Sequence, residues 1–253
     1  MLKSPIFRFA LLASTLLFVA TLPASSQTAI VVSGYGTLNG TTTGNYYTTQ
    51  QTPANQAGGL LELQHLSGPF LGFEATYSYN RTDTTYSNRY PSSNVQGSAS
   101  ASNCPIAYGC PTATVSANAH ESTVDWTPSR LMFKQRMLLF GVLGAGVLAD
   151  VPSSSKATVT TAYPCGLPVN GVFVCGNPGV PPATAASTSE TRVSVEPVYV
   201  YGAGLDWGLL PHLGIRLQYR GNFYSAPKMT KLFSATGAYM HTAEPMVGIY
   251  FVL

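Results

Sequence analysis

Apolar and polar residues alternate along much of the chain. The clearest alternation runs from Leu71 to Asn80, where apolar or aromatic side chains occupy every second position. The segment from Leu213 to Tyr224 repeats the pattern, with arginines on its polar side. Because successive side chains of a strand point to opposite faces, this period of two predicts β-strands. We expect eight of them, at Ala29–Asn39, Ala57–Leu66, Phe70–Thr82, Val115–Thr127, Arg136–Asp150, Arg192–Gly208, His212–Ala226 and Ala238–Leu253.

The lengths of the strands and of their connections favour a membrane barrel over a soluble domain. A tilted membrane strand needs about 9–11 residues, whereas strands of soluble domains cluster near about 5–6. Short connections alternate with long ones rich in Ser, Thr, Asn, Gly and Pro, as turns and outer loops do in outer-membrane barrels. The short connections are Ser67–Pro69, Pro128–Gln135 and Leu209–Pro211, and the long ones are Gly40–Gln56, Asp83–Thr114, Val151–Thr191 and Pro227–Gly237.

The end of the chain indicates how the sheet closes. Val247, Ile249, Phe251 and Leu253 alternate up to the last residue, so the final strand must pair with another to protect its edge. Pairing with the first strand removes both edges, as lipid requires. We therefore predict an all-β fold, an eight-stranded antiparallel up-and-down transmembrane β-barrel with short periplasmic turns and long extracellular loops. A soluble secreted β-domain is the alternative, because alternation alone does not distinguish the inside of a barrel from its outside.

The first 26 residues have the features of a secretory signal peptide. Lys3 and Arg8 supply a positive start, and Phe9–Ala20 is apolar but too short to span a membrane as a helix. Small residues up to Ser26 precede the expected cleavage point. We expect residues 27–253 to form the mature barrel.

Composition agrees with a chain whose outer surface faces lipid. Charged residues make up only 9% of the sequence, which is low for a soluble domain. Without Lys3 and Arg8 the 13 basic residues become 11, against 10 acidic ones. This balance argues against nucleic acid and against strongly charged partners.

The four cysteines fall in two close pairs within loop-like segments. Export would place them in an oxidising compartment, where such pairs form disulfides. We predict the bonds Cys104–Cys110 and Cys165–Cys175. A four-cysteine zinc site is the alternative, although zinc sites prefer tighter spacing.

Three stretches of the chain resemble a known family. Pro245–Leu253 is similar to the C-terminal insertion signal of outer-membrane barrels, with Leu253 in place of their usual terminal phenylalanine. The hairpin Gly58–Tyr79, and Tyr201–Trp207 followed by Leu213–Arg220, resemble the small barrel domain of OmpA-like and OmpW-like outer-membrane proteins. The resemblance covers essentially the whole mature chain.

The resemblance implies a location and a set of partners. It places the chain in the cell outer membrane, in contact with lipid and lipopolysaccharide. It also makes Val247–Leu253 the strand that the barrel assembly machinery recognises. No periplasmic peptidoglycan-binding domain follows, so we do not expect the wall-anchoring role of larger OmpA-type proteins. We expect a monomer.

Most acidic residues of the predicted strands point away from the lipid face. They are Glu62, Glu74, Glu121, Asp125, Glu196, Asp206 and Glu244. Arg216 and Arg220 lie on one strand, and we expect them to pair with Glu196, Asp206 and Glu244 on the two neighbouring strands. Because eight strands leave little open space, this network is interpreted as a structural plug of the lumen. A gate in a narrow pore for small solutes is the alternative.

Aromatic residues near the predicted strand ends are interpreted as membrane girdles. We place Trp126, Trp207, Phe70 and Phe133 at the periplasmic interface, and Tyr77, Tyr79, Tyr219, Phe223 and Tyr224 at the outer one. Tyrosines of the loops could instead form a sugar-binding platform, because recognition usually lies on exposed loops. These are Tyr46, Tyr47, Tyr86 and Tyr90.

One pair of residues could support catalysis. His120 and Ser122 share the lipid-facing side of a strand, an arrangement similar to that of lipid A deacylases, where histidine activates serine. The aromatic residue and asparagine that flank that motif are replaced by Ala119 and Thr123. His65, His212 and His241 are isolated, and no pattern indicates a metal or a cofactor. We expect a non-enzymatic protein with a structural or surface-interaction role.

Overall fold

The computed structural model describes most of the chain after the predicted signal peptide. The predicted signal peptide and all four cysteines lie outside the described residues, so the domain boundary and both disulfides stay predictions. Within the described residues, no helix is long and apolar enough to cross a membrane. The described parts are residues 27–43, 49–68, 70–88, 112–132, 136–153, 156–161, 185–230 and 238–253.

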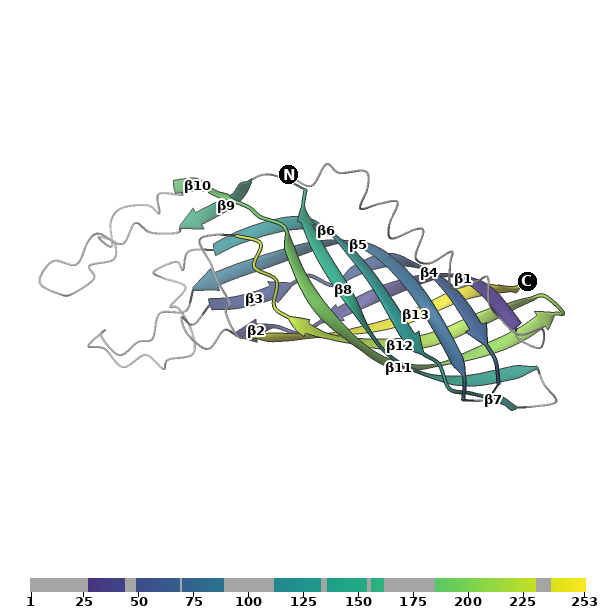
Figure 1. Cartoon of the computed structure of the whole chain (residues 1–253). Helices are drawn as coiled ribbons and strands as arrows, with labels where there is room; N and C mark the ends of the chain where they lie inside the picture. The colour runs from purple at the N-terminus through teal and green to yellow at the C-terminus, as the bar shows by residue number, and fades with distance from the viewer. Residues whose placement is uncertain are drawn as a thin grey trace, which may run out of the picture.

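Eight long antiparallel strands close into a barrel, which confirms the predicted fold (Figure 1). Each pairs with the next one along the chain, and the last pairs with the first. The strands are β1 (Gln27–Asn39), β4 (Gln56–Leu66), β5 (Gly72–Asn88), β6 (Thr112–Trp126), β8 (Met137–Pro152), β11 (Ser194–Leu210), β12 (Leu213–Ser225) and β13 (Tyr239–Val252).

The seam between the first and last strands is paired almost along its whole length. In the ladder between β1 and β13, Ile30 lies opposite Phe251 and Asn39 lies opposite Thr242. The Leu253 N–H donates to the Thr28 carbonyl oxygen at 2.9 Å, so the pairing continues to the end of the chain. The last strand therefore pairs with the first, as the sequence predicts, and neither has an unpaired edge in the barrel.

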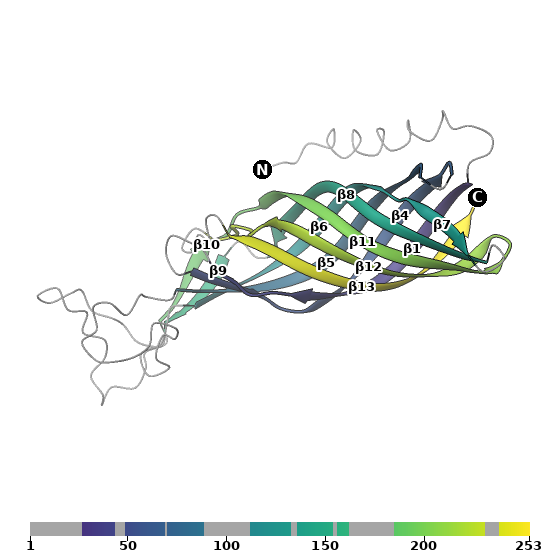
Figure 2. The same cartoon turned by 90° about the horizontal axis from the view of Figure 1, so that it is seen from below.

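Short strands extend the sheet into segments that were predicted to be irregular. β2 (Thr42–Thr43), β3 (Thr49–Pro53), β9 (Lys156–Thr161) and β10 (Ala185–Glu190) lie in the predicted loops, and β7 (Ser129–Met132) lies in a predicted turn. β3 pairs with the far end of β5, and β9 pairs with β6. β2, β3, β9 and β10 lie at the end of the barrel opposite the C-terminus (Figures 1 and 2). Strand pairing therefore continues beyond the closed barrel on the side of the long connections.

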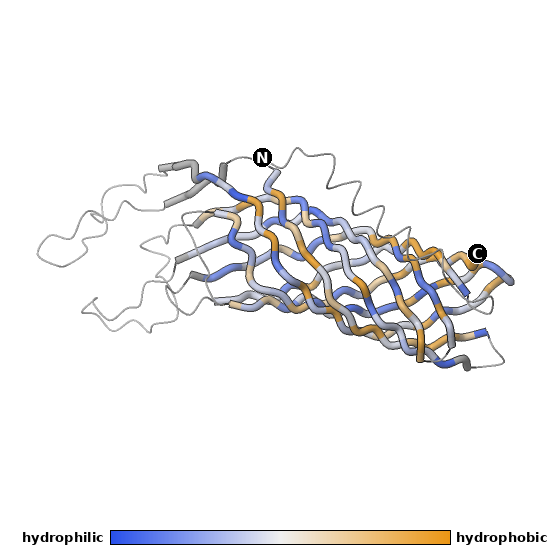
Figure 3. The backbone as a smooth tube through the Cα atoms, in the orientation of Figure 1, coloured by the Kyte–Doolittle hydropathy of each residue, from blue (hydrophilic) through white to orange (hydrophobic). Residues whose placement is uncertain are grey.

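The alternating apolar and polar residues of the strands point to the outside and to the inside of the barrel, respectively. Outward side chains such as Val32, Val124 and Leu143 are apolar and well exposed, and the tube in Figure 3 shows apolar positions recurring along the strands. Inward positions are mostly polar or charged. β1 and β8, whose alternation is blurred, direct Val31 and Phe140 into the lumen. Apolar residues thus also fill part of the interior.

Candidate functional site

Arg216 of β12 lies at the centre of an acidic cluster inside the barrel. Its Nε and Nη2 atoms donate to the two carboxylate oxygens of Asp206 on β11, each at 2.7 Å. Its Nη1 atom donates to Glu62 on β4 and, at 3.0 Å, to Glu74 on β5. Nη2 also donates to Gln64 Oε1 at 2.8 Å. One fully buried guanidinium therefore joins strands on opposite sides of the lumen.

An aromatic ring supports this guanidinium from one face. The Arg216 Cζ atom lies 4.5 Å from the centre of the Phe140 ring, a cation–π distance. A Cβ atom at Gly204 would overlap that ring, so the glycine makes room for it. The position of Arg216 thus depends on residues of β8 and β11 as well as on its carboxylate partners.

Arg220 forms a second layer, four residues further along β12. Its Nη2 atom donates to Glu121 Oε1 at 3.1 Å and lies 3.6 Å from Asp125 Oδ2. Nη1 donates to the Thr76 hydroxyl, and Nη2 to the Thr123 hydroxyl, each at 3.2 Å. Because these partners lie on β5 and β6, this layer also crosses the lumen.

A side-chain amide continues the network toward the outer mouth. Asn222 Nδ2 donates to Glu121 Oε2 at 2.9 Å and to Glu244 Oε1 at 3.0 Å. Glu244 lies opposite Arg220 in the ladder between β12 and β13. The two carboxylates are therefore held close together by one neutral amide.

The structure brings together only some of the residues predicted for the network. Asp206 binds Arg216, and Glu244 joins through Asn222. Glu196 lies elsewhere: it is half-buried near the start of β11, and its Oε1 accepts a hydrogen bond from Ser194 at 3.1 Å.

Four further carboxylates also lie within ion-pair distance of the arginines. Glu62, Glu74, Glu121 and Asp125 bind them from β4, β5 and β6. Sequence alternation predicts that these residues face inward, but the arginine partners predicted from the sequence lie only on the two adjacent strands. Contacts across a barrel interior leave no mark on the spacing of residues along the chain.

A small cavity of about 40 Å³ lies in the outer half of the lumen, bordered by the upper layer of this network. Its polar lining includes Tyr35, Glu121, Asp150, Asn222 and Glu244. The side chains of Arg216 and Arg220 are completely buried. The middle of the lumen is therefore filled by hydrogen-bonded side chains, as in other small barrels.

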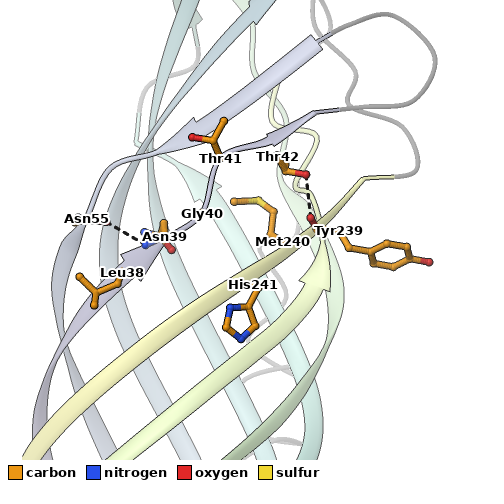
Figure 4. Close-up of a pocket in the computed structure, with 9 residues that line it drawn as sticks. All are labelled: Leu38, Asn39, Gly40, Thr41, Thr42, Asn55, Tyr239, Met240 and His241. Atoms are coloured by element: carbon orange, nitrogen blue, oxygen red, sulfur yellow. Dashed lines mark hydrogen bonds between the residues drawn. The ribbon is translucent and has the colours of Figure 1, made fainter.

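A larger pocket of about 400 Å³ lies at the outer rim, where β1 and β13 end their pairing (Figure 4). The Asn39 N–H donates to Asn55 Oδ1 at 3.0 Å, and the Thr42 hydroxyl donates to the Tyr239 carbonyl oxygen at 2.9 Å. The His241 ring also lines the pocket and hydrogen-bonds the Tyr201 hydroxyl. Amide, hydroxyl and imidazole groups give this pocket the chemistry to bind a polar, uncharged ligand.

His120 and Ser122 lie on the outer face of β6, as predicted. The Tyr77 hydroxyl lies 2.8 Å from His120 Nδ1, and the Tyr79 ring centre lies 5.2 Å from that of the imidazole. In the described part of the chain, no carboxylate hydrogen-bonds His120 and no hydrogen bond joins it to Ser122. The histidine is held by tyrosines instead of being aligned with a serine.

Most predicted girdle residues point outward. Trp126, Trp207 and Phe70 are exposed, and Trp126 Nε1 donates to the Phe70 carbonyl oxygen at 2.7 Å. The remaining exposed members are Tyr77, Tyr79, Tyr219 and Phe223.

Two tyrosines differ from their predicted environment. Tyr224 packs against buried residues of the interior, and its hydroxyl lies 3.1 Å from that of Thr242. Tyr86 is buried, and its hydroxyl donates to the Pro227 carbonyl oxygen at 3.0 Å, so it is no exposed sugar platform. Tyr46, Tyr47, Tyr90 and Phe133 lie outside the described residues.

Comparisons with known proteins find similarity of structure only. No family model matches the chain, and no curated protein sequence matches it significantly. Outer membrane protein OprG of Pseudomonas aeruginosa has 11% identity and a TM-score of 0.44, with 90% of this chain and 96% of that chain covered. Ail of Yersinia pestis has 12% identity and a TM-score of 0.37, with coverage of 90% and 99%. Neisserial surface protein A has 9% identity and a TM-score of 0.36, with coverage of 88% and 96%.

The strand pairing and the distribution of apolar and charged side chains define the class of this protein. The eight long strands are paired on both sides, most of their outward side chains are apolar, and seven carboxylates and two arginines are buried in the interior. Lipid demands this combination, and water does not, since a soluble barrel would bury its apolar face. The chain is a small outer-membrane β-barrel, located in the cell outer membrane.

Proposed function

We propose that this protein is a non-enzymatic outer-membrane barrel with a structural or surface-interaction role. The observation that carries the proposal is the double layer of charged side chains around Arg216 and Arg220, which fills the middle of the lumen. Because side chains fill the lumen, little space remains for a solute to pass through it. The parts of the molecule available for recognition are then the outer wall and the outer mouth.

The outer mouth supports the surface-interaction part of the proposal. β3 and β9 extend the sheet on that side, and the rim pocket near Asn39 and His241 opens there. Recognition in barrels resides in segments that a rigid scaffold holds outside the membrane. We infer that lipid and lipopolysaccharide contact the outer wall, that β13 serves the barrel assembly machinery, and that the protein acts as a monomer.

Planar-bilayer recording tests the role of the lumen. The whole chain inserted into a bilayer is expected to give no conductance steps. A narrow pore is the second candidate, favoured by the carboxylate-lined cavity in the outer half of the lumen. Steps in the wild-type protein that are lost in Arg216→Ala or Arg220→Ala would contradict the proposal and support the pore.

An activity assay tests the non-enzymatic part of the proposal. Purified barrel incubated with lipid A is expected to release no fatty acid, because the imidazole of His120 is bonded to Tyr77 and has no orienting carboxylate among the described residues. Release that disappears in Ser122→Ala would show a deacylase instead. Ser116→Ala, on the same face of β6, is the matched control.

A further inference from the structure

The residues that follow β12 turn into the outer mouth of the barrel. Residues 226–230 belong to a connection that was predicted to be an extracellular loop, yet Ala226, Met229 and Thr230 are at most 1% exposed. They form no strand, and an isolated bridge joins Thr230 to Thr191. We call residues 226–230 the strap. Connecting segments normally run over the surface, so burial of the strap requires partners for its backbone.

The start of β11, the neighbour of β12, supplies partners on the near wall. The Arg192 N–H donates to the Met229 carbonyl oxygen at 3.0 Å, and Arg192 Nε donates to the Lys228 carbonyl oxygen at 2.7 Å. The Lys228 N–H donates to the hydroxyl of Ser194, the first residue of β11, at 3.0 Å. Backbone groups of the strap are therefore fixed beside the strand from which the strap leaves.

The strap also reaches the opposite wall. β5 lies four strands from β12 in either direction around the eight-stranded barrel. The Pro227 carbonyl oxygen accepts hydrogen bonds from the Tyr86 hydroxyl of β5 at 3.0 Å and from Gln51 Nε2 of β3 at 2.6 Å. Met229 packs in an apolar cluster with Tyr86 and with residues of β6. The strap therefore crosses the mouth from one wall to the other.

The small cavity of the lumen lies between the strap and the charged layers. Pro227 of the strap lines it, and so does Glu121, the partner of Arg220. Ser78, in the same lining, is only 5% exposed, so solvent outside the barrel hardly reaches the cavity. The lumen is thus closed at two levels, by the strap at the mouth and by the arginine layers in the middle.

We propose that the strap is a lid, which opens by releasing the far wall while it stays attached to the near wall. The near wall holds the strap by its backbone, including the bond from Arg192 to Met229. The far wall holds it through the side chains of Gln51 and Tyr86, which meet at one carbonyl oxygen. Segments held by few hydrogen bonds open locally at a lower free-energy cost than strand ladders.

Opening of the lid admits water and small solutes to the cavity. They go no further, because the layers around Arg216 and Arg220 stay closed. This limit rests on the proposed function, in which those layers fill the middle of the lumen.

The test is the rate at which iodoacetamide labels a thiol introduced by Ser78→Cys in the whole chain, folded in detergent micelles. Mass spectrometry of the digested protein reads this position separately from the native cysteines, and Thr82→Cys repeats the measurement elsewhere in the cavity lining. Labelling follows the population of the open state. Tyr86→Phe keeps the ring but removes the hydroxyl that binds Pro227, and it speeds labelling on the order of 5-fold, the effect of losing one neutral hydrogen bond. Adding Gln51→Leu raises the factor to on the order of 25-fold.

Two controls separate opening of the lid from loosening of the barrel. Tyr79→Phe is the matched substitution on β5, because the Tyr79 hydroxyl donates to Asn118 on the outer wall, and it leaves labelling unchanged. Ser33→Cys reports on the charged layers, because the Ser33 hydroxyl donates to Glu62, and its thiol stays protected in every variant.

Two results would overturn the lid. One is labelling at Ser78→Cys that stays at the wild-type rate when Tyr86→Phe and Gln51→Leu are combined. The other is labelling that rises equally at Ser33→Cys, which would mean that the whole barrel opens. The bilayer recording measures passage through the middle of the lumen and not access to its mouth, so the lid and the proposed function fail separately.

Discussion

At the scale of single residues, the interior depends on the geometry of arginine. The planar guanidinium of Arg216 bonds both oxygens of Asp206 and still reaches Glu62, Glu74 and Gln64. Lysine has one compact charged group and could not bridge these strands in the same way. The residue therefore holds the barrel interior together through shape as much as through charge.

Arg216→Ala is expected to destabilise the barrel by about 3–5 kcal/mol, because it leaves buried carboxylates without their countercharge. Urea unfolding in micelles, followed by tryptophan fluorescence, measures the change in the free energy of unfolding. Glu196→Gln, at a half-buried carboxylate outside the network, is expected to stay within about 0.5 kcal/mol of the wild type. A loss in Arg216→Ala no larger than in this control would show that the network contributes nothing.

Gly204→Ala tests the space beneath the Arg216 guanidinium. A Cβ atom at this position would overlap the Phe140 ring, whereas one at Gly59 would have no heavy atom within 4 Å. We expect Gly204→Ala to cost about 1–3 kcal/mol, as overpacking usually does, and Gly59→Ala to cost almost nothing. The same urea titration compares them, and equal effects of the two substitutions would contradict the packing described here.

At the scale of elements, each strand separates two environments. Leu217 of β12 is 52% exposed on the outer face and lies opposite Leu205 and Val247, both apolar. The next residue along the strand, Gln218, faces the lumen and is buried. A shift of the register by one residue would exchange these faces and put charge into lipid.

Leu217→Arg is expected to cost about 2–4 kcal/mol in lipid vesicles, because it places a charge in the apolar band. Val193→Arg is the matched control, since Val193 is similarly exposed but precedes β11 at its outer end, where the expected cost is about 0–1 kcal/mol. Unfolding by urea in vesicles measures both. Equal costs for the two variants would argue against a membrane-depth effect and hence against the band.

At the scale of the whole molecule, closure of the sheet governs behaviour in detergent and in cells. Because β1 and β13 are paired along almost their whole length, the native barrel is expected to migrate faster than the boiled chain in gel electrophoresis. External protease added to whole cells is expected to cleave between β5 and β6 or between β9 and β10, on the side of the long connections. Heat-independent mobility, or recovery of the chain in the periplasm without detergent, would contradict a closed barrel in the outer membrane.

The sequence predicted the barrel well because strand alternation is a local property. All eight long strands occur where the period of two placed them, with ends displaced by a few residues in most cases. β5 extends six residues beyond its predicted end at Thr82, because its outer part pairs with β3. Such pairing between distant segments is not visible in the composition of a polar, Ser- and Thr-rich stretch.

The sequence alone determined the strands, their order and the inward position of the acidic residues, since each follows from which side chains tolerate lipid. Only the tertiary structure decided which side chains meet across the lumen. Arg216 and Gln64 are 152 positions apart in sequence, yet their side chains bond across the lumen. Because the sheet curves into a narrow barrel, one guanidinium reaches side chains on the opposite wall. The spacing of residues along the chain does not show which side chains come within this distance.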